Sequence, residues 1–269
     1  MFKIAYCAGH HLGNPKGVPK SMGLGEIREW TLNDRVARYF AEAAGQYEDV
    51  ELLRTDDPTG ETLVDIPERC GAANWWGADI YIDMHHNGGA NNTNAGGVVA
   101  YHRPKDAKSE AYAKAIYEAV VAAGGLRGNR ASPIQEKNWQ TMKEAEMPAV
   151  LMEYGFMDSP DDVPVILTEE HAKVCGYATV DAIAKKAGLK RLPSPAEAPA
   201  GTLRYKGIAD APEYARHTIA ELMACGALNG TGSEKGIDLD LDALRVLTIV
   251  TRYAKYLHGL DPEQPELVE

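Results

Sequence analysis

Two pairs of histidines and one isolated glutamate give this sequence the means to bind a metal ion and to move protons. His10-His11 and His85-His86 each close an apolar run, and Glu153 lies within another. Two imidazole nitrogens and one carboxylate oxygen are a known ligand set for catalytic zinc, which leaves a fourth position for water. A carboxylate outside that set can take a proton from the water and pass it to a leaving group. These residue types therefore indicate a zinc-dependent hydrolase.

The carboxylate of the ligand set is expected near the start of the helix that follows the first strand. Glu26 and Glu29 both stand there, and the pattern of residue types does not choose between them. Glu153 differs, because its surroundings in the chain are almost wholly apolar and a buried carboxylate is costly unless it is paired or used. The alternative for Glu153 is a structural role, as a partner of a loop amide or an arginine. The histidines in its company favour the functional interpretation.

These residues are far apart in the sequence, so a fold must bring them together, and the order of strand and helix patterns along the chain predicts that fold. Apolar runs typical of strands occupy residues 3–8, 50–55, 80–85, 97–102 and 149–154. Segments with helical periodicity and capping residues occupy residues 28–44, 65–76, 106–123 and 168–188. This alternation predicts an α/β fold, a mostly parallel twisted sheet with helices on both faces. The strand ends, and with them His10, His85 and Glu153, are expected at one edge of the sheet.

A segment rich in proline and alanine, residues 190–203, predicts a linker between two domains. Residues 1–189 would form the catalytic domain. Residues 204–269 have two helical patterns joined by a glycine-rich turn, and we expect a small helical domain there.

Composition and charge exclude several classes of protein. The 28 Lys and Arg against 39 Asp and Glu give a net charge of −11, which argues against a nucleic-acid partner. The sequence has no apolar run of about 18 residues, so we expect no membrane span. No secretory signal is recognised at Met1, so we expect synthesis in the cytoplasm. The cysteines are scattered along the chain, and buried free thiols are expected for Cys7, Cys70 and Cys175.

Five segments, read in order, carry a family resemblance. They are residues 8–10, 29–33, 53–57, 84–87 and 147–157. Over about residues 3–187 the chain resembles the zinc-dependent N-acetylmuramoyl-L-alanine amidases, which include phage endolysins and bacterial cell wall hydrolases. The resemblance implies hydrolysis of the amide bond between N-acetylmuramic acid and L-alanine in peptidoglycan, by a zinc-bound water with a glutamate general base. Such an enzyme would act on the cell wall after its release.

The resemblance also implies roles for individual residues. His10, Glu29 and His85 would bind one Zn²⁺ ion, Glu153 would serve as general base and acid, and Asn87 would contact the substrate.

The chain departs from the family pattern at two positions. His11 stands where the family has a small residue, and Asp83 stands where it has serine. The roles of His11, His86 and Glu26 stay open.

The pattern in residues 204–269 resembles a single surface-layer-homology repeat, and such repeats anchor proteins to secondary cell wall polymers. A helical hairpin that packs on the catalytic domain or forms a homodimer is the alternative. For the whole chain, two other functions compete with the amidase. One is a different zinc peptidase or amidase acting on wall stem peptides, and the other is a non-catalytic wall-binding protein.

Overall fold

The computed structural model describes residues 1–24, 26–91, 95–192, 216 and 219. The chain divides into two units, Met1–Arg191 and Leu192–Glu269. The expected linker and the helical domain with its repeat-like pattern lie outside the described residues, apart from residues 190–192, 216 and 219.

A six-stranded sheet forms the centre of the first unit, in the order β4-β1-β5-β8-β6-β7. The strands are β1 (Phe2–Ala8), β4 (Val50–Arg54), β5 (Ile80–Asn87), β6 (Val99–His102), β7 (Ile134–Glu136) and β8 (Ala149–Phe156). The four strands β4, β1, β5 and β8 are mutually parallel, whereas β6 is antiparallel to β8 and β7 is parallel to β6. The expected mostly parallel α/β sheet is confirmed.

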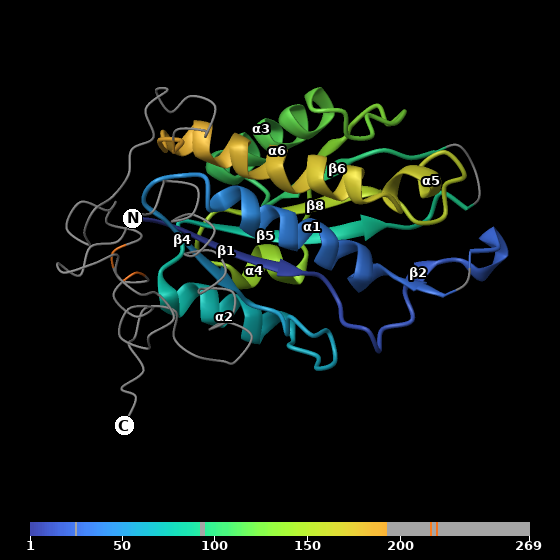
Figure 1. The fold of residues 1–269 in the computed structure, drawn as a ribbon, viewed down its shortest axis with the longest axis horizontal. Helices are drawn as coiled ribbons and strands as arrows, with labels where there is room; N and C mark the ends of the chain where they lie inside the picture. Colours follow the sequence, from blue (N-terminus) through green and yellow to red (C-terminus); the bar gives the residue numbers. More distant parts are fainter. Residues whose placement is uncertain (25, 92–94, 193–215, 217–218, 220–269) are drawn as a thin grey trace, which may run out of the picture. The chain divides into compact units, whose positions relative to one another are not determined.

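Helices cover both faces of the sheet (Figure 1). On one side lie α1 (Glu29–Ala44), α3 (Ala107–Ala122) and α6 (Glu169–Ala187), and on the other lie α2 (Ile66–Trp76) and α4 (Gln140–Glu144). The remaining short elements are a hairpin of β2 (Gly17–Val18) and β3 (Ile27–Arg28), a 3-10 helix η1 (Lys20–Met22) and α5 (Val163–Ile166). These short elements, α4 and β7 were not predicted, because two to five residues are too few to show a periodicity.

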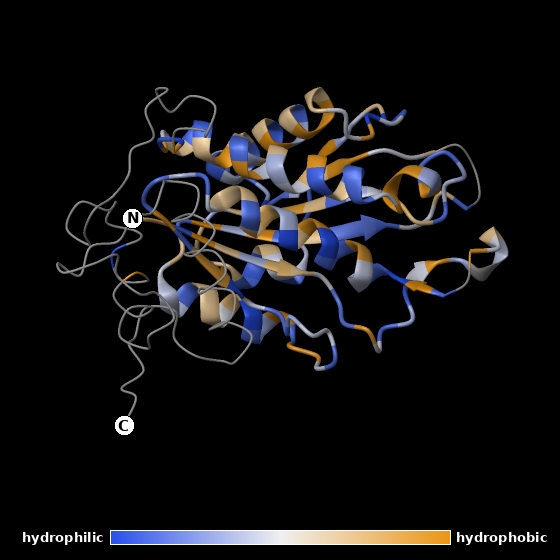
Figure 2. Ribbon diagram, in the orientation of Figure 1, coloured by the Kyte–Doolittle hydropathy of each residue, from blue (hydrophilic) through white to orange (hydrophobic). Residues whose placement is uncertain are grey.

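The central strands are buried on both faces, which explains their nearly continuous apolar sequences. Alternate residues of β1, β5 and β8 pack under α1, α3 and α6, and the intervening residues form a second cluster with α2 and α4. Figure 2 shows that β5 becomes hydrophilic at its carboxyl end, in contrast to the apolar β1 beside it. Asp83, His85 and Glu153 lie in strand positions that alternate with the first core, so they share the second face.

Local signals at the helix ends behave as expected. The carboxylate of Asp65 accepts a hydrogen bond from the backbone N–H of Glu68 at the start of α2, and the hydroxyl of Thr168 accepts one from His171 N–H at the start of α6. Both helices end at glycines in the left-handed conformation, Gly77 and Gly188.

Cys7, Cys70 and Cys175 are buried and free, as expected. Within the described part of the chain, no helix combines the length and the apolar character that crossing a membrane would require.

Two helical glycines provide a matched test of this packing. A Cβ added at Gly176 would lie 2.6 Å from the backbone nitrogen of Phe40, so α1 and α6 approach closely there, whereas a Cβ at Gly71 meets nothing within 4 Å. We expect Gly176→Ala to lower the free energy of unfolding by about 1–3 kcal/mol through overpacking. Gly71→Ala should raise it by roughly 0.5–1 kcal/mol, because alanine is the better helix former. Urea denaturation of both variants measures the difference, and equal effects would contradict the close α1–α6 contact.

Candidate metal and catalytic site

The carboxyl ends of β1 and β5 and the first turn of α1 meet at one place in the structure. His10 follows β1 and adopts a φ of 68°, a left-handed conformation that is uncommon for a residue with a side chain. The guanidinium of the buried Arg69 donates hydrogen bonds to the backbone carbonyls of Ala8, at 3.4 Å, and His10, at 2.8 Å. Arg69 therefore holds the turn after β1 in this conformation, and the turn aims the His10 ring at the start of α1.

Glu29, the first residue of α1, lies between the two histidines. Its Oε1 is 2.9 Å from Nδ1 of His85, and its Oε2 is 3.1 Å from Nε2 of His10. The two imidazoles meet edge to face, with ring centroids 4.9 Å apart and an interplanar angle of 87°. The ligand atoms of these three side chains all lie within 4.8 Å of one another, and they form the one such group of three found among the described residues.

The charges within this group are mutually stabilising. Burial alone would raise the pKa of Glu29, but hydrogen bonds from His10 and His85 more than offset it and hold that pKa well below its ordinary value. Burial lowers the pKa of His85, whereas the carboxylates of Asp83 and Glu29 raise it, and the net result is a pKa well above the usual range. Glu29 is therefore a carboxylate, and it can accept hydrogen bonds or bind a cation.

The second nitrogen of His85 contacts another carboxylate. Nε2 of His85 lies 3.0 Å from Oδ1 of Asp83, two residues earlier on the same face of β5. Sequence analysis noted Asp83 only as a departure from the family pattern. The alternation of strand residues was the available signal, because it places the side chains of positions 83 and 85 on the same face.

Glu153 lies beside this group on the neighbouring strand. Its Cα pairs with that of His85 in the parallel register of β5 and β8, and its side chain is buried, with a residue exposure of 8%. Among the described residues, its Oε2 is the one buried side-chain oxygen or nitrogen without a hydrogen-bond partner. Burial raises the pKa of Glu153, the charge of His85 lowers it and the carboxylates of Glu29 and Asp83 raise it, and the net pKa is about 8. An unpartnered carboxyl oxygen in such a place is available for proton transfer.

The side chains of the two neighbouring histidines have partners outside the group. His86 points into the core, where its Nδ1 lies 2.8 Å from Oδ1 of Asn33, and burial lowers its pKa to about 3. His11 is half-buried, and its Nδ1 accepts a hydrogen bond from the Gly13 backbone N–H at 3.2 Å. Both contacts are structural, in the core and in a turn.

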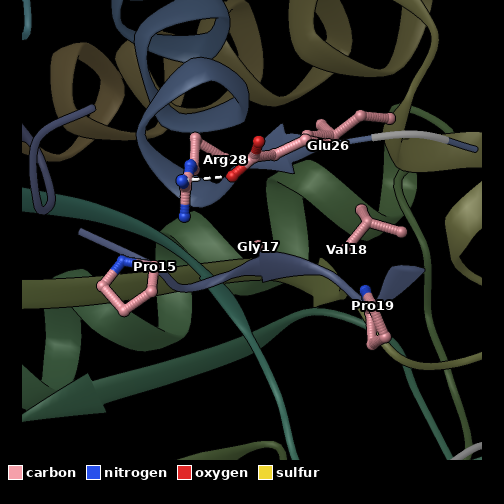
Figure 3. Close-up of a pocket in the computed structure, with 7 residues that line it drawn as sticks. Pro15, Gly17, Val18, Pro19, Glu26 and Arg28 are labelled. Carbon is pink, nitrogen blue, oxygen red and sulfur yellow. Dashed lines mark ion pairs between the residues drawn. The ribbon is translucent and has the colours of Figure 1, made fainter. Parts of the chain in front are cut away.

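Glu26 is engaged away from the histidines, in an ion pair with Arg28 (Figure 3). The pair borders a pocket of 330 Å³ beneath the β2–β3 hairpin, which is lined by Pro15, Gly17, Val18, Pro19, Glu26, Ile27 and Arg28. Of the two acids at the start of α1, the structure therefore brings only Glu29 to His10 and His85.

Asn87 ends β5 next to the group, and its Oδ1 accepts a hydrogen bond from the Gly88 backbone N–H at 2.9 Å. Burial and the charge of Glu153 raise the pKa of Tyr101, a residue that sequence analysis missed, and the side chain of Asn87 lowers it. The Tyr101 ring packs against Trp139, with centroids 4.5 Å apart. Tyr101 could not be placed from sequence, because its position beside Asn87 depends on the antiparallel pairing of β6 with β8.

Comparison with known proteins identifies relatives of this arrangement. A family described as N-acetylmuramoyl-L-alanine amidase matches residues 4–185. The sporulation-specific N-acetylmuramoyl-L-alanine amidase of Bacillus subtilis (strain 168) is 28% identical over 198 residues, which are 72% of this chain and 71% of that protein. The probable cell wall amidase LytH of Staphylococcus aureus is 28% identical over 134 residues, which are 50% of this chain and 41% of that protein. The match therefore spans less than half of the staphylococcal protein.

Solved structures share the fold. The catalytic domain of CwlV, an N-acetylmuramoyl-L-alanine amidase from Bacillus (Paenibacillus) polymyxa var. colistinus, superposes with a TM-score of 0.62 at 22% identity, covering 71% of this chain and 100% of that one. An N-acetylmuramoyl-L-alanine amidase from Clostridium difficile 630 gives a TM-score of 0.63 at 22% identity, covering 70% of this chain and 97% of that one. At these identities the likeness shows a common fold.

Gly9 provides a test of how tightly the group is packed. A Cβ added there would overlap the His85 ring, whereas a Cβ at the nearby Gly88 meets nothing within 4 Å. We expect Gly9→Ala to displace the imidazole and to weaken zinc binding by about 10-fold or more, in the range seen when a group that orients a metal ligand is removed. Chelator competition measures the affinity, and Gly88→Ala is the matched control. Equal zinc affinity for Gly9→Ala and the unaltered chain would contradict the close contact.

The buried His86 predicts a pH-dependent stability. Its pKa of about 3 lies below the ordinary value of 6.5, so between these limits the unfolded chain binds a proton that the folded chain does not. The contribution of His86 to the free energy of unfolding is therefore complete above pH 6.5. It is lost as the pH falls, by about 2 kcal/mol between pH 7 and pH 5. Urea denaturation in EDTA at both pH values should show this loss, and His86→Gln should reduce it. An unchanged pH dependence in His86→Gln would show that His86 is not the group responsible.

Proposed function

The chain belongs to the N-acetylmuramoyl-L-alanine amidase family, and on this premise we propose that it uses one zinc ion to cleave the bond between N-acetylmuramic acid and L-alanine. The family and the fold support an amidase that acts on peptidoglycan. The observation that carries the finer proposal is the convergence of His10, Glu29 and His85 beside a buried, unpartnered Glu153 oxygen. The zinc-dependent chemistry of the proposal depends on these four side chains.

The donor set fits zinc. Two imidazole nitrogens and a carboxylate are borderline and hard ligands of the kind that hold catalytic zinc, and their ligand atoms already lie within 4.8 Å of one another. His10, Glu29 and His85 would hold the ion. When bound, the cation supplies Lewis acidity, which polarises the scissile carbonyl and makes water more acidic. One carboxylate and two neutral imidazoles leave the site with a net charge of about +1, which favours an anionic transition state.

Glu153 is the proton-transferring group of the proposal. The protein groups alone hold its pKa at about 8, and a cation next to His85 would lower that pKa, so the carboxylate is ready to accept a proton. Oε2 takes the proton from the attacking water and returns it to the nitrogen of the departing L-alanine. Because Oε2 has no competing hydrogen bond among the described residues, no partner must be displaced before it acts.

Asn87 and Tyr101 would contact the substrate on the side of the site next to Glu153. The side chains of Asn87 and Glu153 both influence the pKa of Tyr101, so the three residues lie close together. An amide and a phenol offer both donors and acceptors, which suits the polar groups of a glycopeptide.

Two other functions, a non-catalytic wall-binding protein and a zinc peptidase, can be distinguished from the amidase. A non-catalytic wall-binding protein would not need Glu153, and an unpartnered buried carboxyl would only destabilise it. A zinc peptidase acting on the stem peptide would use the same four residues and give different products. Mass spectrometry of purified peptidoglycan digests distinguishes this peptidase from the amidase, because an amidase frees L-alanine amino termini and leaves the glycan strands intact. Cleavage within the stem peptide would show that the bond assigned to this enzyme is wrong.

The same Glu→Gln change at three positions tests the assigned roles. Glu153→Gln should keep its zinc and lose about 10²–10⁴-fold in wall hydrolysis, because the amide cannot accept the proton. Glu29→Gln should lose zinc together with activity. Glu26→Gln is the matched control, since Glu26 pairs with Arg28 outside the group, and it should behave like the unaltered chain.

Zinc content by mass spectrometry and the rate of release of soluble wall fragments are the two readouts. A loss below tenfold in Glu153→Gln would assign proton transfer to another residue, and loss of its zinc would make Glu153 a ligand.

A further inference from the structure

A second buried carboxylate contacts the candidate metal group, at the nitrogen of His85 that does not face Glu29. Asp83 has an exposed fraction of 4% and lies on β5 two residues before His85. Both of its oxygens have hydrogen-bond partners, which lie on β1, β5 and α4. A buried charge of this kind is retained only where it has partners or a use.

The two nitrogens of His85 face two different carboxylates. Nδ1 lies 2.9 Å from Oε1 of Glu29, on the side of the proposed ion, and Nε2 lies 3.0 Å from Oδ1 of Asp83. Both oxygens of Asp83 accept hydrogen bonds from neighbouring side chains, so the carboxyl acts as an acceptor and the nitrogen next to it carries the hydrogen. Nδ1 faces Glu29 and would give up its hydrogen to bind a cation, and its lone pair would then point to the ion while Nε2 keeps its hydrogen for Asp83.

Asp83 is itself held by two other elements. The Cys7 thiol of β1 donates to Oδ1 at 3.0 Å, and the Thr141 hydroxyl of α4 donates to Oδ2 at 2.8 Å. With His85 these bonds use both oxygens, so the carboxylate cannot rotate without breaking one of them. Gly9 lies against the His85 ring and leaves no room for a Cβ, so the ring also has little freedom.

We propose that Asp83 is a positioning residue, which fixes the tautomer and the orientation of His85 and thereby sets the affinity of the site for its metal ion. The inference rests on the metal site of the proposed function. Serine, which the family resemblance leads one to expect at this position, would act differently, because a hydroxyl both donates and accepts and would not select one tautomer. Carboxylates that orient a metal-bound histidine typically strengthen metal binding by about 10- to 100-fold.

Three substitutions at one position, with one control, test the proposal in the full chain. Asp83→Ala removes the acceptor, and we expect zinc affinity to fall by about 10- to 100-fold. Asp83→Asn keeps an oxygen toward Nε2 while its NH₂ can donate to the Thr141 hydroxyl, so it should restore much of the affinity. Asp83→Ser should bind zinc more weakly than Asp83→Asn. Thr141→Val is the control, because it removes one partner of Asp83 and leaves the Asp83–His85 contact in place, and it should change affinity only a few-fold.

The readouts separate positioning from a purely structural role. Zinc affinity is measured by competition with a chromogenic chelator at a temperature where each variant is folded by circular dichroism. The visible spectrum of the Co²⁺-saturated protein reports the geometry of the ligands. Positioning predicts an altered cobalt spectrum in Asp83→Ala and recovery in Asp83→Asn, whereas a structural role predicts lower thermal stability with unchanged affinity and spectrum.

Each outcome decides one question. If the unaltered chain binds no zinc, the proposed function is wrong. If it binds zinc and Asp83→Ala binds equally well with the same cobalt spectrum, the proposed function stands and Asp83 has no positioning role. Should Asp83→Ala fail to fold, the comparison of Asp83→Ser with Asp83→Asn carries the test, and equal affinities there would overturn the inference.

Discussion

A carboxylate buried in a protein interior is unfavourable unless hydrogen-bond donors or positive charge surround it, and Glu29 has an imidazole at each of its two oxygens. Helix α1 and strands β1 and β5 place Glu29 between these two imidazoles. Helix α1 begins at Glu29, where the positive end of the helix dipole stabilises a negative charge. The parallel pairing of β1 with β5 brings the two histidine-bearing strand ends together, and both strands are buried on both faces. Loss of either strand end would leave one oxygen of the Glu29 carboxylate without its imidazole.

Glu153 lies one strand away from Glu29's partner His85 and in the opposite electrostatic situation. The two imidazoles hold the pKa of Glu29 far below its ordinary value, whereas burial without a partner raises the pKa of Glu153 to about 8. Two carboxyl groups whose surroundings push their pKa values apart are typical of sites that divide binding from proton transfer. In this protein the separation of the two carboxyl groups follows from strand order, because β5 lies between Glu153 on β8 and the turn that carries His10.

Much of this arrangement could be predicted from sequence because it depends on long apolar strands. The runs before His10 and His85 and around Glu153 were sufficient to predict parallel strands, and the carboxyl ends of parallel strands necessarily meet at one edge. The choice of Glu29 over Glu26 needed the family resemblance, since the Glu26–Arg28 pair depends on the two-residue strands of the β2–β3 hairpin. Tyr101 acquires its position from the register of β6 with β8, which no local pattern reveals. The contact of Asp83 with His85 could have been found, because their i, i+2 spacing in one strand marks them as neighbours.

The central claim is that His10, Glu29 and His85 hold a zinc ion while Glu153 stays outside its ligand set. Anomalous diffraction at the zinc edge, from crystals of the full chain grown with zinc, tests it most directly. We predict a single peak within bonding distance of Nε2 of His10, the Glu29 carboxylate and Nδ1 of His85, with Glu153 nearby and unbound. A peak bonded to His11 or His86, a peak with Glu153 in place of Glu29, or no peak among the three side chains would contradict the account.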